Sequence, residues 1–129
     1  MQPESRTMKP LSSPMVRAVE TARSHLEQNY GQRILLEDLG KVAAVSPFHL
    51  ARLFKAHVGT SPHRYLMRVR IARAIELLCT TALTVGQIGQ RVGFASLSHF
   101  TMTFRSEVGS TPTNFRRENL EGCSPRRLV

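Results

Sequence analysis

The sequence predicts an all-α protein in which two helix-turn-helix subdomains, seven helices in all, are joined by a long linker helix. Apolar residues recur at spacings of three and four, and no segment alternates cleanly, which is typical of helices and not of strands. Residues that favour helix starts recur along the chain, and one segment returns about 50 residues later. Together these observations indicate short, repeated helical units.

Helix starts are marked by a hydroxyl residue directly before proline. The hydroxyl accepts a free backbone N–H of the first turn, and proline is tolerated there because it lacks an N–H. The pairs are Ser13-Pro14, Ser46-Pro47, Ser61-Pro62 and Thr111-Pro112. Thr84 and Gln87 form a capping box, and Ser96 precedes another helix. Leu35, which has no hydroxyl, stands directly before the predicted helix 36–43, so that helix is predicted to be poorly capped.

The predicted helices cover residues 14–29, 36–43, 47–58, 62–79, 85–92, 97–108 and 112–118, with glycine stops at Gly31, Gly59 and Gly109. Residues 14–61 are then a first helix-turn-helix subdomain, 62–80 the linker helix and 81–118 a second subdomain. Residues 1–13 and 119–129 are expected to be flexible ends.

Residues 46–62 return as residues 96–112 at an offset of 50. The matched positions are Ser46 with Ser96, His49 with His99, Phe54 with Phe104, Lys55 with Arg105, Val58 with Val108, Gly59 with Gly109 and Pro62 with Pro112. Upstream, an offset of 49 pairs Leu39 with Ile88 and Ala44 with Gly93. Each copy is a short helix, a tight turn and a longer helix, as in a helix-turn-helix.

A helical projection gives each longer helix an inward and an outward face. The inward residues are Leu50, Leu53, Phe54 and His57 in the first copy, and Phe100, Thr103, Phe104 and Val108 in the second. The outward residues are Phe48, Ala51, Arg52 and Lys55, then Ser98, Thr101, Met102 and Arg105, with Pro47 and Leu97 at the entry turns. These faces fit a DNA major groove, which admits one α-helix, although such residues would also suit an ordinary solvent-facing surface.

Roles on DNA follow from the chemistry of each side chain. Arg52 is suited to guanine, Ser98 and Thr101 to a base edge or phosphate, and Lys55 and Arg105 to phosphates. Phe48, Ala51, Leu97 and Met102 are suited to thymine methyl groups. Candidate phosphate contacts at the helix entrances are Ser46, His49, Ser96 and His99, the two histidines being either half-buried or on phosphate.

Charge and composition restrict the function classes. Eighteen Lys and Arg against nine Asp and Glu give a net charge of +9, and residues 39–75 hold seven basic and no acidic residues. Such a chain attracts polyanions, either nucleic acid or an anionic membrane surface. No long apolar stretch indicates a membrane span or signal peptide, which favours the cytoplasm. No phosphate loop, paired carboxylates, CxxC or HExxH pattern indicates an enzyme, a cofactor or a metal site.

The second copy resembles the AraC/XylS family of transcription regulators. The residues that carry the resemblance are Ile88, Gly93-Phe94, Ser96, Phe100, Phe104-Arg105, Gly109, Thr111-Pro112 and Phe115-Arg116, with Pro62, Tyr65-Leu66, Arg70-Ile71, Ala74 and Leu77-Leu78 in the linker. The resemblance implies recognition helices in successive major grooves, about 34 Å apart. It also implies a double-stranded, asymmetric site of about 20 base pairs and recruitment of RNA polymerase, usually for activation. Gly40 and Gly89 depart from the alanine common in the family, at a helix cost of about 0.5–1 kcal/mol each.

Several alternatives remain open from the sequence. The chain resembles small, stand-alone, monomeric family members, but it would also fit the isolated DNA-binding domain of a larger, effector-controlled regulator. A helical protein-interaction module would use the same outward faces without needing basic residues at matched positions. RNA binding lacks aromatic stacking platforms. The second reading face has few strong donors before Arg105, so it is expected to read DNA shape or phosphates more than base edges.

Overall fold

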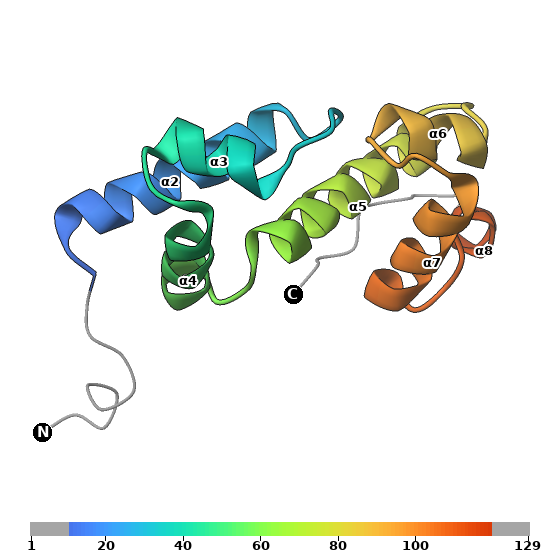
Figure 1. Cartoon of the computed structure of the whole chain (residues 1–129). Helices are drawn as coiled ribbons and strands as arrows, with labels where there is room; N and C mark the ends of the chain where they lie inside the picture. Colours follow the sequence, from blue (N-terminus) through green and yellow to red (C-terminus); the bar gives the residue numbers. More distant parts are fainter. Residues whose placement is uncertain (1–10, 120–129) are drawn as a thin grey trace, which may run out of the picture. The chain divides into compact units, whose positions relative to one another are not determined.

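The computed structural model describes residues 11–119 of the chain, and within this range it contains seven helices and no strand (Figure 1). They are α2 (Ser13–Gln28), α3 (Leu36–Ala43), α4 (Pro47–Val58), α5 (Pro62–Thr80), α6 (Val85–Arg91), α7 (Leu97–Val108) and α8 (Pro112–Glu118). The all-α prediction is confirmed, and three helices have ends that differ by one residue from the prediction. Of the expected flexible ends, residues 11–13 and Asn119 lie within the described range, where Ser12 caps α2, Ser13 begins it and Asn119 follows α8; the rest lies outside the described residues.

Hydroxyl caps begin most of the helices as predicted. The Oγ of Ser46 accepts from the backbone N of His49 at 3.2 Å, and Ser96 does the same for His99 at 3.1 Å. For α2 the predicted cap was wrong by one residue, because Ser12 and not Ser13 accepts the bond from Met15. Pro14 is still tolerated, since it lies in the first turn, where no N–H partner is needed.

The two short helices α3 and α6 begin differently. Thr84 and Gln87 make both bonds of a capping box, at 3.1 Å and 2.9 Å. Leu35 offers no side-chain acceptor, as expected, but its own backbone N donates to the carboxylate of Asp38 at 3.2 Å. Half of the capping box is therefore present in the first copy, which partly offsets the missing hydroxyl.

The chain divides into two units. Within the described range, unit 1 holds residues 11–29 and 34–65, and unit 2 holds residues 30–33 and 66–119. The first turn of α5 therefore belongs to unit 1 and the rest of α5 to unit 2. The buried apolar residues of unit 1 are Ala18, Val19, Ala22, Leu26, Leu39, Leu50, Leu53 and Phe54, which shows that α2, α3 and α4 share one core.

The core of unit 2 is built around a chain of aromatic rings. Phe94 lies 5.2 Å from Phe100, Phe100 lies 5.8 Å from Phe104, and Phe104 lies 5.7 Å from Phe115, measured between ring centroids. These separations and the tilted or edge-on ring angles are favourable for aromatic pairs. All four rings are buried, so the turn before α7, α7 itself and α8 are joined through one continuous apolar cluster.

The repeat is visible in the geometry of equivalent residues. Phe54 and Tyr65 meet edge-on with centroids 5.6 Å apart and an interplanar angle of 69°. Phe104 and Phe115, each 50 positions later, meet at 5.7 Å and 70°. The C-caps Gly59 and Gly109 adopt φ angles of 98° and 97°. The predicted internal repeat is thus confirmed at the level of ring packing and helix ends.

Glycine is needed inside the short helices because other groups approach the backbone closely. A Cβ on Gly89 would lie 2.7 Å from the ring of Phe100, and one on Gly40 would lie 2.7 Å from the carbonyl oxygen of Val45. Both distances are shorter than real Cβ contacts, so alanine would force a shift. The two departures from the family pattern are therefore required by packing.

Two arginine side chains, one buried and one half-buried, donate hydrogen bonds to backbone carbonyl oxygens. The sequence did not indicate this role. In unit 2, Arg70 donates to the carbonyl oxygens of Tyr30 at 2.7 Å and Gln32 at 2.9 Å. Arg116 donates to those of Leu78, Thr81 and Leu83 at 3.1, 3.1 and 2.6 Å. Burial lowers the pKa of the Arg70 guanidinium, but arginine remains charged at any ordinary pH. The guanidinium satisfies backbone carbonyls that would otherwise be left unpaired.

Candidate nucleic-acid interface

The outward face of α4 carries an exposed aromatic ring and two exposed cations. Phe48 is 80% exposed, Arg52 and Lys55 are exposed, and Ala51 is half-buried between them. Among residues 11–119, neither Arg52 nor Lys55 forms an ion pair or a side-chain hydrogen bond. Exposed cations without internal partners are available to an anionic ligand, which agrees with the placement predicted from the sequence.

The outward face of α7 has the same register but a different chemistry. Met102 is 65% exposed and Leu97 56% exposed, while Ser98 and Arg105 are exposed and Thr101 is half-buried. Arg105 makes no ion pair within the part of the chain that the structure describes. The structure therefore brings all the predicted outward residues of α7 to one surface of unit 2, and that surface is mostly apolar and hydroxylic.

The entrances of α4 and α7 place hydroxyls and imidazoles beside free backbone N–H groups. Ser46 and Ser96 are exposed, and their oxygens each accept a cap bond while the hydroxyl hydrogen stays able to donate. His49 is half-buried, as is Pro47. His99 is exposed and lies edge-on to Phe94, with ring centroids 5.2 Å apart. Both helix entrances thus keep the positive end of the helix dipole open to an anion.

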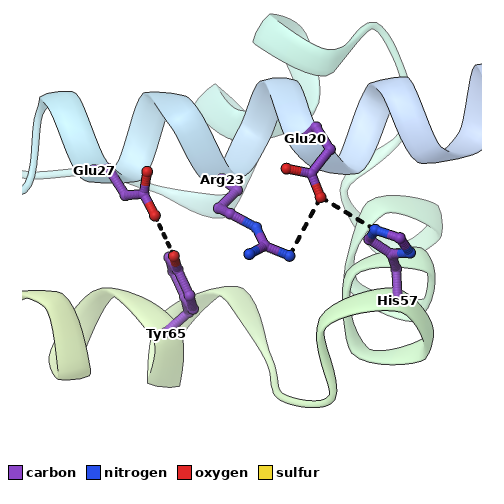
Figure 2. Close-up of polar contacts among 5 residues, drawn as sticks. All are labelled: Glu20, Arg23, Glu27, His57 and Tyr65. Carbon is purple, nitrogen blue, oxygen red and sulfur yellow. Dashed lines mark hydrogen bonds and ion pairs between the residues drawn. The ribbon is translucent and has the colours of Figure 1, made fainter. Parts of the chain in front are cut away.

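α4 packs against unit 1 through its buried apolar face, and polar side chains link it to α2. Leu50 and Phe54 are fully buried on the side opposite the outward face. Figure 2 shows Glu20 of α2 bound both to Arg23, at 3.2 Å, and to the imidazole of His57, at 3.1 Å. This network links the last turn of α4 to α2 within unit 1.

His57 was predicted to lie on the inward face, and this was wrong. Its side chain lies at the edge of α4, with 32% of it exposed, and binds Glu20 instead of entering the core. The same view shows the hydroxyl of Tyr65, in the first turn of α5, donating to the carboxylate of Glu27. Partial burial, followed by the bond and charge of Glu27, raises the pKa of Tyr65 to about 12. A polar partner for an imidazole is a long-range contact that helical periodicity cannot reveal.

The basic run of residues 39–75 does not form one surface. Arg68 lies 3.6 Å from the carboxylate of Glu107, Arg70 is buried, and Arg73 binds Glu76 at 3.3 Å. Lys41, Arg52 and Lys55 remain exposed and make no ion pair within residues 11–119. Within this run, the charge available to a polyanion therefore lies in unit 1 on α3 and α4, while Arg105 supplies an exposed cation in unit 2.

A hollow beside α4 and another beside α7 add residues that helical spacing did not indicate. In unit 1 the hollow is lined by residues that include Lys41, Ser46 and Pro47, and in unit 2 an open hollow is lined by residues that include Gln90 and Ser96. The offset of 49 that pairs the turns also pairs Lys41 with Gln90, and this signal could have found them. Each is exposed on the short helix that precedes the recognition helix.

Comparison with known proteins places the chain in a family. A helix-turn-helix domain family matches residues 39–118. The transcriptional activator RhaS of Enterobacter sp. strain 638 is 35% identical over 92 residues, 71% of this chain and 33% of RhaS. The C-terminal domain of AraT, a response regulator from Geobacillus stearothermophilus, has a TM-score of 0.79 at 30% identity and covers 88% of this chain and 91% of that one. The DNA-binding domain of AdpA, solved in complex with a target DNA, has a TM-score of 0.69 at 29% identity, over 83% of this chain and 93% of that one.

The chain belongs to the AraC/XylS family of helix-turn-helix transcription regulators. Its curated relatives in the AraC/XylS family are longer, since the matched region makes up 29% to 47% of their own length. The helices found between residues 11 and 119 include none with the length and apolar character needed to cross a bilayer.

Proposed function

We propose that this chain is a sequence-specific, double-stranded DNA-binding transcription regulator that places α4 and α7 in successive major grooves. The observation that carries the proposal is the pair of equivalent outward faces on repeat-related helices. Their cations, Arg52, Lys55 and Arg105, have no internal ion pair among residues 11–119. An α-helix fits the major groove, and unpaired cations there would replace counterions at the phosphates.

Individual roles are assigned by position along each helix. The first residues of a recognition helix lie nearest the base edges, so we assign Arg52 to a guanine and Phe48 and Ala51 to a thymine methyl. In α7, Leu97, Ser98, Thr101 and Met102 take the base-edge positions. Lys55 and Arg105, one turn further along, are assigned to phosphates, which set register and orientation.

The helix entrances are assigned to the DNA backbone. Ser46 and Ser96 present hydroxyl hydrogens and the first backbone N–H groups of their helices, and Pro47 packs at the entry turn. His49 and His99 are assigned to phosphates beside them. Such contacts carry no sequence information, but they fix how deep each helix enters the groove.

The target is an asymmetric site of about 20 base pairs with half-sites about one helical turn, or 34 Å, apart. Asymmetry follows from the two unlike reading faces, so one monomer would fill the site. We further assign the chain to activation with RNA polymerase in the cytoplasm, without enzymatic activity of its own. The name of the activator RhaS supports this, and the greater length of the relatives also supports the second possibility, a DNA-binding domain of a larger effector-controlled regulator.

The first test is selection of binding sites from random double-stranded DNA, followed by titrations across a salt series. We expect one asymmetric site with two informative blocks a helical turn apart, and an affinity that falls steeply with salt. If only one block of the selected site shows a base preference, unit 2 contacts phosphates without reading bases. No enriched site and weak salt dependence would reject the DNA-reading proposal in favour of a protein-interaction module.

The Lys55→Ala variant distinguishes contacts with phosphates, which are independent of sequence, from contacts with bases. Lys55→Ala should weaken binding to selected and random DNA alike and reduce the salt slope by about one, because one phosphate contact is lost. A loss confined to a single base pair would contradict the phosphate assignment of Lys55. Transcription with purified RNA polymerase on a promoter carrying the selected site then tests activation, and unchanged or reduced transcript would reject it.

A further inference from the structure

We infer that the second unit reads the C5-methyl groups of pyrimidines and does not distinguish thymine from 5-methylcytosine. This rests on the proposed function, since it concerns how α7 reads DNA once it lies in the major groove. The consequence is that methylation of a cytosine in the second half-site would create a contact that the unmethylated base lacks.

The first support is the exposure of apolar side chains. The three most exposed large hydrophobic side chains of residues 11–119 are Phe48 at 80%, Met102 at 65% and Leu97 at 56%. All three lie on the recognition helices, and two of them lie on α7. Large apolar groups left in water indicate a surface that is buried in a complex, and methyl groups are the apolar feature of the major groove.

The second support is the absence of a fixed hydrogen-bond donor or acceptor near the start of α7. Its first six residues are Leu97, Ser98, His99, Phe100, Thr101 and Met102. Phe100 is buried in the core, and the ring of His99 lies against Phe94. Arg105 comes only in the last turn, beyond the positions that reach base edges. The base-edge positions of α7 therefore hold two apolar side chains and two hydroxyls.

The hydroxyls matter because they can both donate and accept. Thymine presents an acceptor oxygen beside its methyl group, whereas 5-methylcytosine presents a donor amine at the same place. Ser98 is exposed and Thr101 is half-buried, and a rotating hydroxyl at either position satisfies either base. Neither position rejects the methylated cytosine, and Leu97 and Met102 contact the methyl group in both cases.

The equivalent position in unit 1 has the opposite chemistry. Arg52 stands 50 residues before Met102, and its guanidinium is a donor only. A donor-only group favours guanine acceptors and makes no use of a methyl group. The base read by Arg52 is therefore expected to show no methyl effect and serves as an internal control, whereas Phe48 and Ala51 are the unit 1 residues assigned to a thymine methyl.

The experiment is a four-way comparison at single positions of the selected site. At each thymine, one duplex keeps thymine–adenine, one carries uracil–adenine, one 5-methylcytosine–guanine and one cytosine–guanine. Affinities are measured by fluorescence anisotropy with the full chain and with Met102→Ala and Leu97→Ala, both exposed positions whose variants are expected to fold. Circular dichroism and thermal melting confirm that folding is retained.

At one or two positions of the second half-site, both methylated pairs should bind about fourfold more tightly than both unmethylated pairs. Met102→Ala or Leu97→Ala should remove this difference, whereas an effect of methylation on DNA shape alone would persist in the variants. Met102→Arg should convert the same position to a preference for guanine.

Two results would overturn the inference. Either no position shows a methyl effect that depends on Met102 or Leu97, or 5-methylcytosine binds no better than cytosine at the positions where thymine is preferred to uracil. Both can occur while the selected site is still bound tightly. Failure of the proposed function looks different, because no site would be selected at all.

Discussion

Unit 1 and unit 2 have matching frames and unlike reading faces. The ring pairs Phe54–Tyr65 and Phe104–Phe115 differ by 0.1 Å and 1°, being 5.6 Å and 69° against 5.7 Å and 70°. At the outward positions, however, Arg52 corresponds to Met102 and Phe48 to Ser98. The glycine C-caps and these ring pairs match between the units, whereas the outward residues contribute little to folding and can differ between half-sites.

The turns of the two units also differ, and here the difference concerns stability. Ala44 adopts a left-handed conformation with φ of 62°, and Gly93 adopts φ of 111° at the equivalent place. Ala44 is exposed, so it bears the strain without a clash. A Cβ on Gly93 would lie 2.7 Å from the Arg70 guanidinium and 2.7 Å from the carbonyl oxygen of Tyr30. Unit 2 therefore depends on glycine where unit 1 does not.

The largest expected effect comes from Gly93→Ala. Left-handed strain and the collision with Arg70 and Tyr30 together should lower the free energy of unfolding by roughly 3 kcal/mol. Urea unfolding measures it, with Gly86→Ala as the control, because a Cβ there meets nothing within 4 Å. The control should be neutral or more stable by up to about 1 kcal/mol. Equal stability of the two variants would show that the turn of unit 2 is more tolerant than its contacts indicate.

Next in size is the loss of the guanidinium in unit 1. Arg52→Ala should weaken binding to the selected site by about 1–3 kcal/mol and relax the preference at one base pair. Met102→Ala, at the equivalent place in unit 2, should change the affinity by much less, about fourfold. Competition titrations with single-base variants of the site measure both. If Arg52→Ala leaves every base preference intact, the assignment of Arg52 to a guanine is wrong.

Ala44→Gly should raise the free energy of unfolding slightly. Relief of left-handed strain is worth about 1–2 kcal/mol, and the extra freedom of glycine in the unfolded chain returns about 0.5–1 kcal/mol of it. The variant should therefore be more stable by roughly 0.5 kcal/mol, measured by urea unfolding. A loss of stability would mean that the Ala44 methyl group makes a contact worth more than the strain.

The smallest effect concerns the alkaline stability of unit 1. The pKa of Tyr65 is raised to about 12 by burial and by Glu27, above its unfolded value of about 10. The bond therefore stabilises the protein fully below pH 10, and its contribution is lost as the pH rises through 12. The difference in Tm between the wild type and Tyr65→Phe should shrink over this window. A constant difference in Tm would contradict the raised pKa. In a Tyr30→Phe variant Tyr65 is the one tyrosine left, so the rise of tyrosinate absorbance with pH then reports the pKa of Tyr65 directly.

Local patterns in the sequence were enough for the helices, because caps act within four residues. Ser46, Ser96, Thr84 and Thr111 each bond to a backbone N–H three residues away, as predicted. The outward faces were likewise predictable, since Phe48 and Met102 follow from helical spacing. Their contacts with DNA remain predictions.

Long-range contacts could not be read from the sequence in the same way. His57 has the spacing of a core residue, yet its partner Glu20 lies 37 positions earlier. Arg70 falls in a basic run, so charge patterning suggested a polyanion, whereas its partners are carbonyl groups 40 and 38 positions away. Gly40 and Gly89 looked like weak helix formers because the groups that crowd them lie on other segments. Each miss concerns a contact with another element or turn, which the periodicity of one helix does not encode.

The hydrogen bonds of Arg70 to the carbonyl oxygens of Tyr30 and Gln32 limit how this chain can be joined with a relative in a chimeric protein. The segment that Arg70 holds, residues 30–33, lies in the sequence between two helices of unit 1 but belongs to unit 2. A chimera that joins the first 61 residues of one relative to the remainder of another would pair this loop with a foreign helix. Exchange of half-site specificity is therefore better made by grafting outward residues, which keeps Arg70, Gly93 and the loop around Tyr30 together, than by swapping segments.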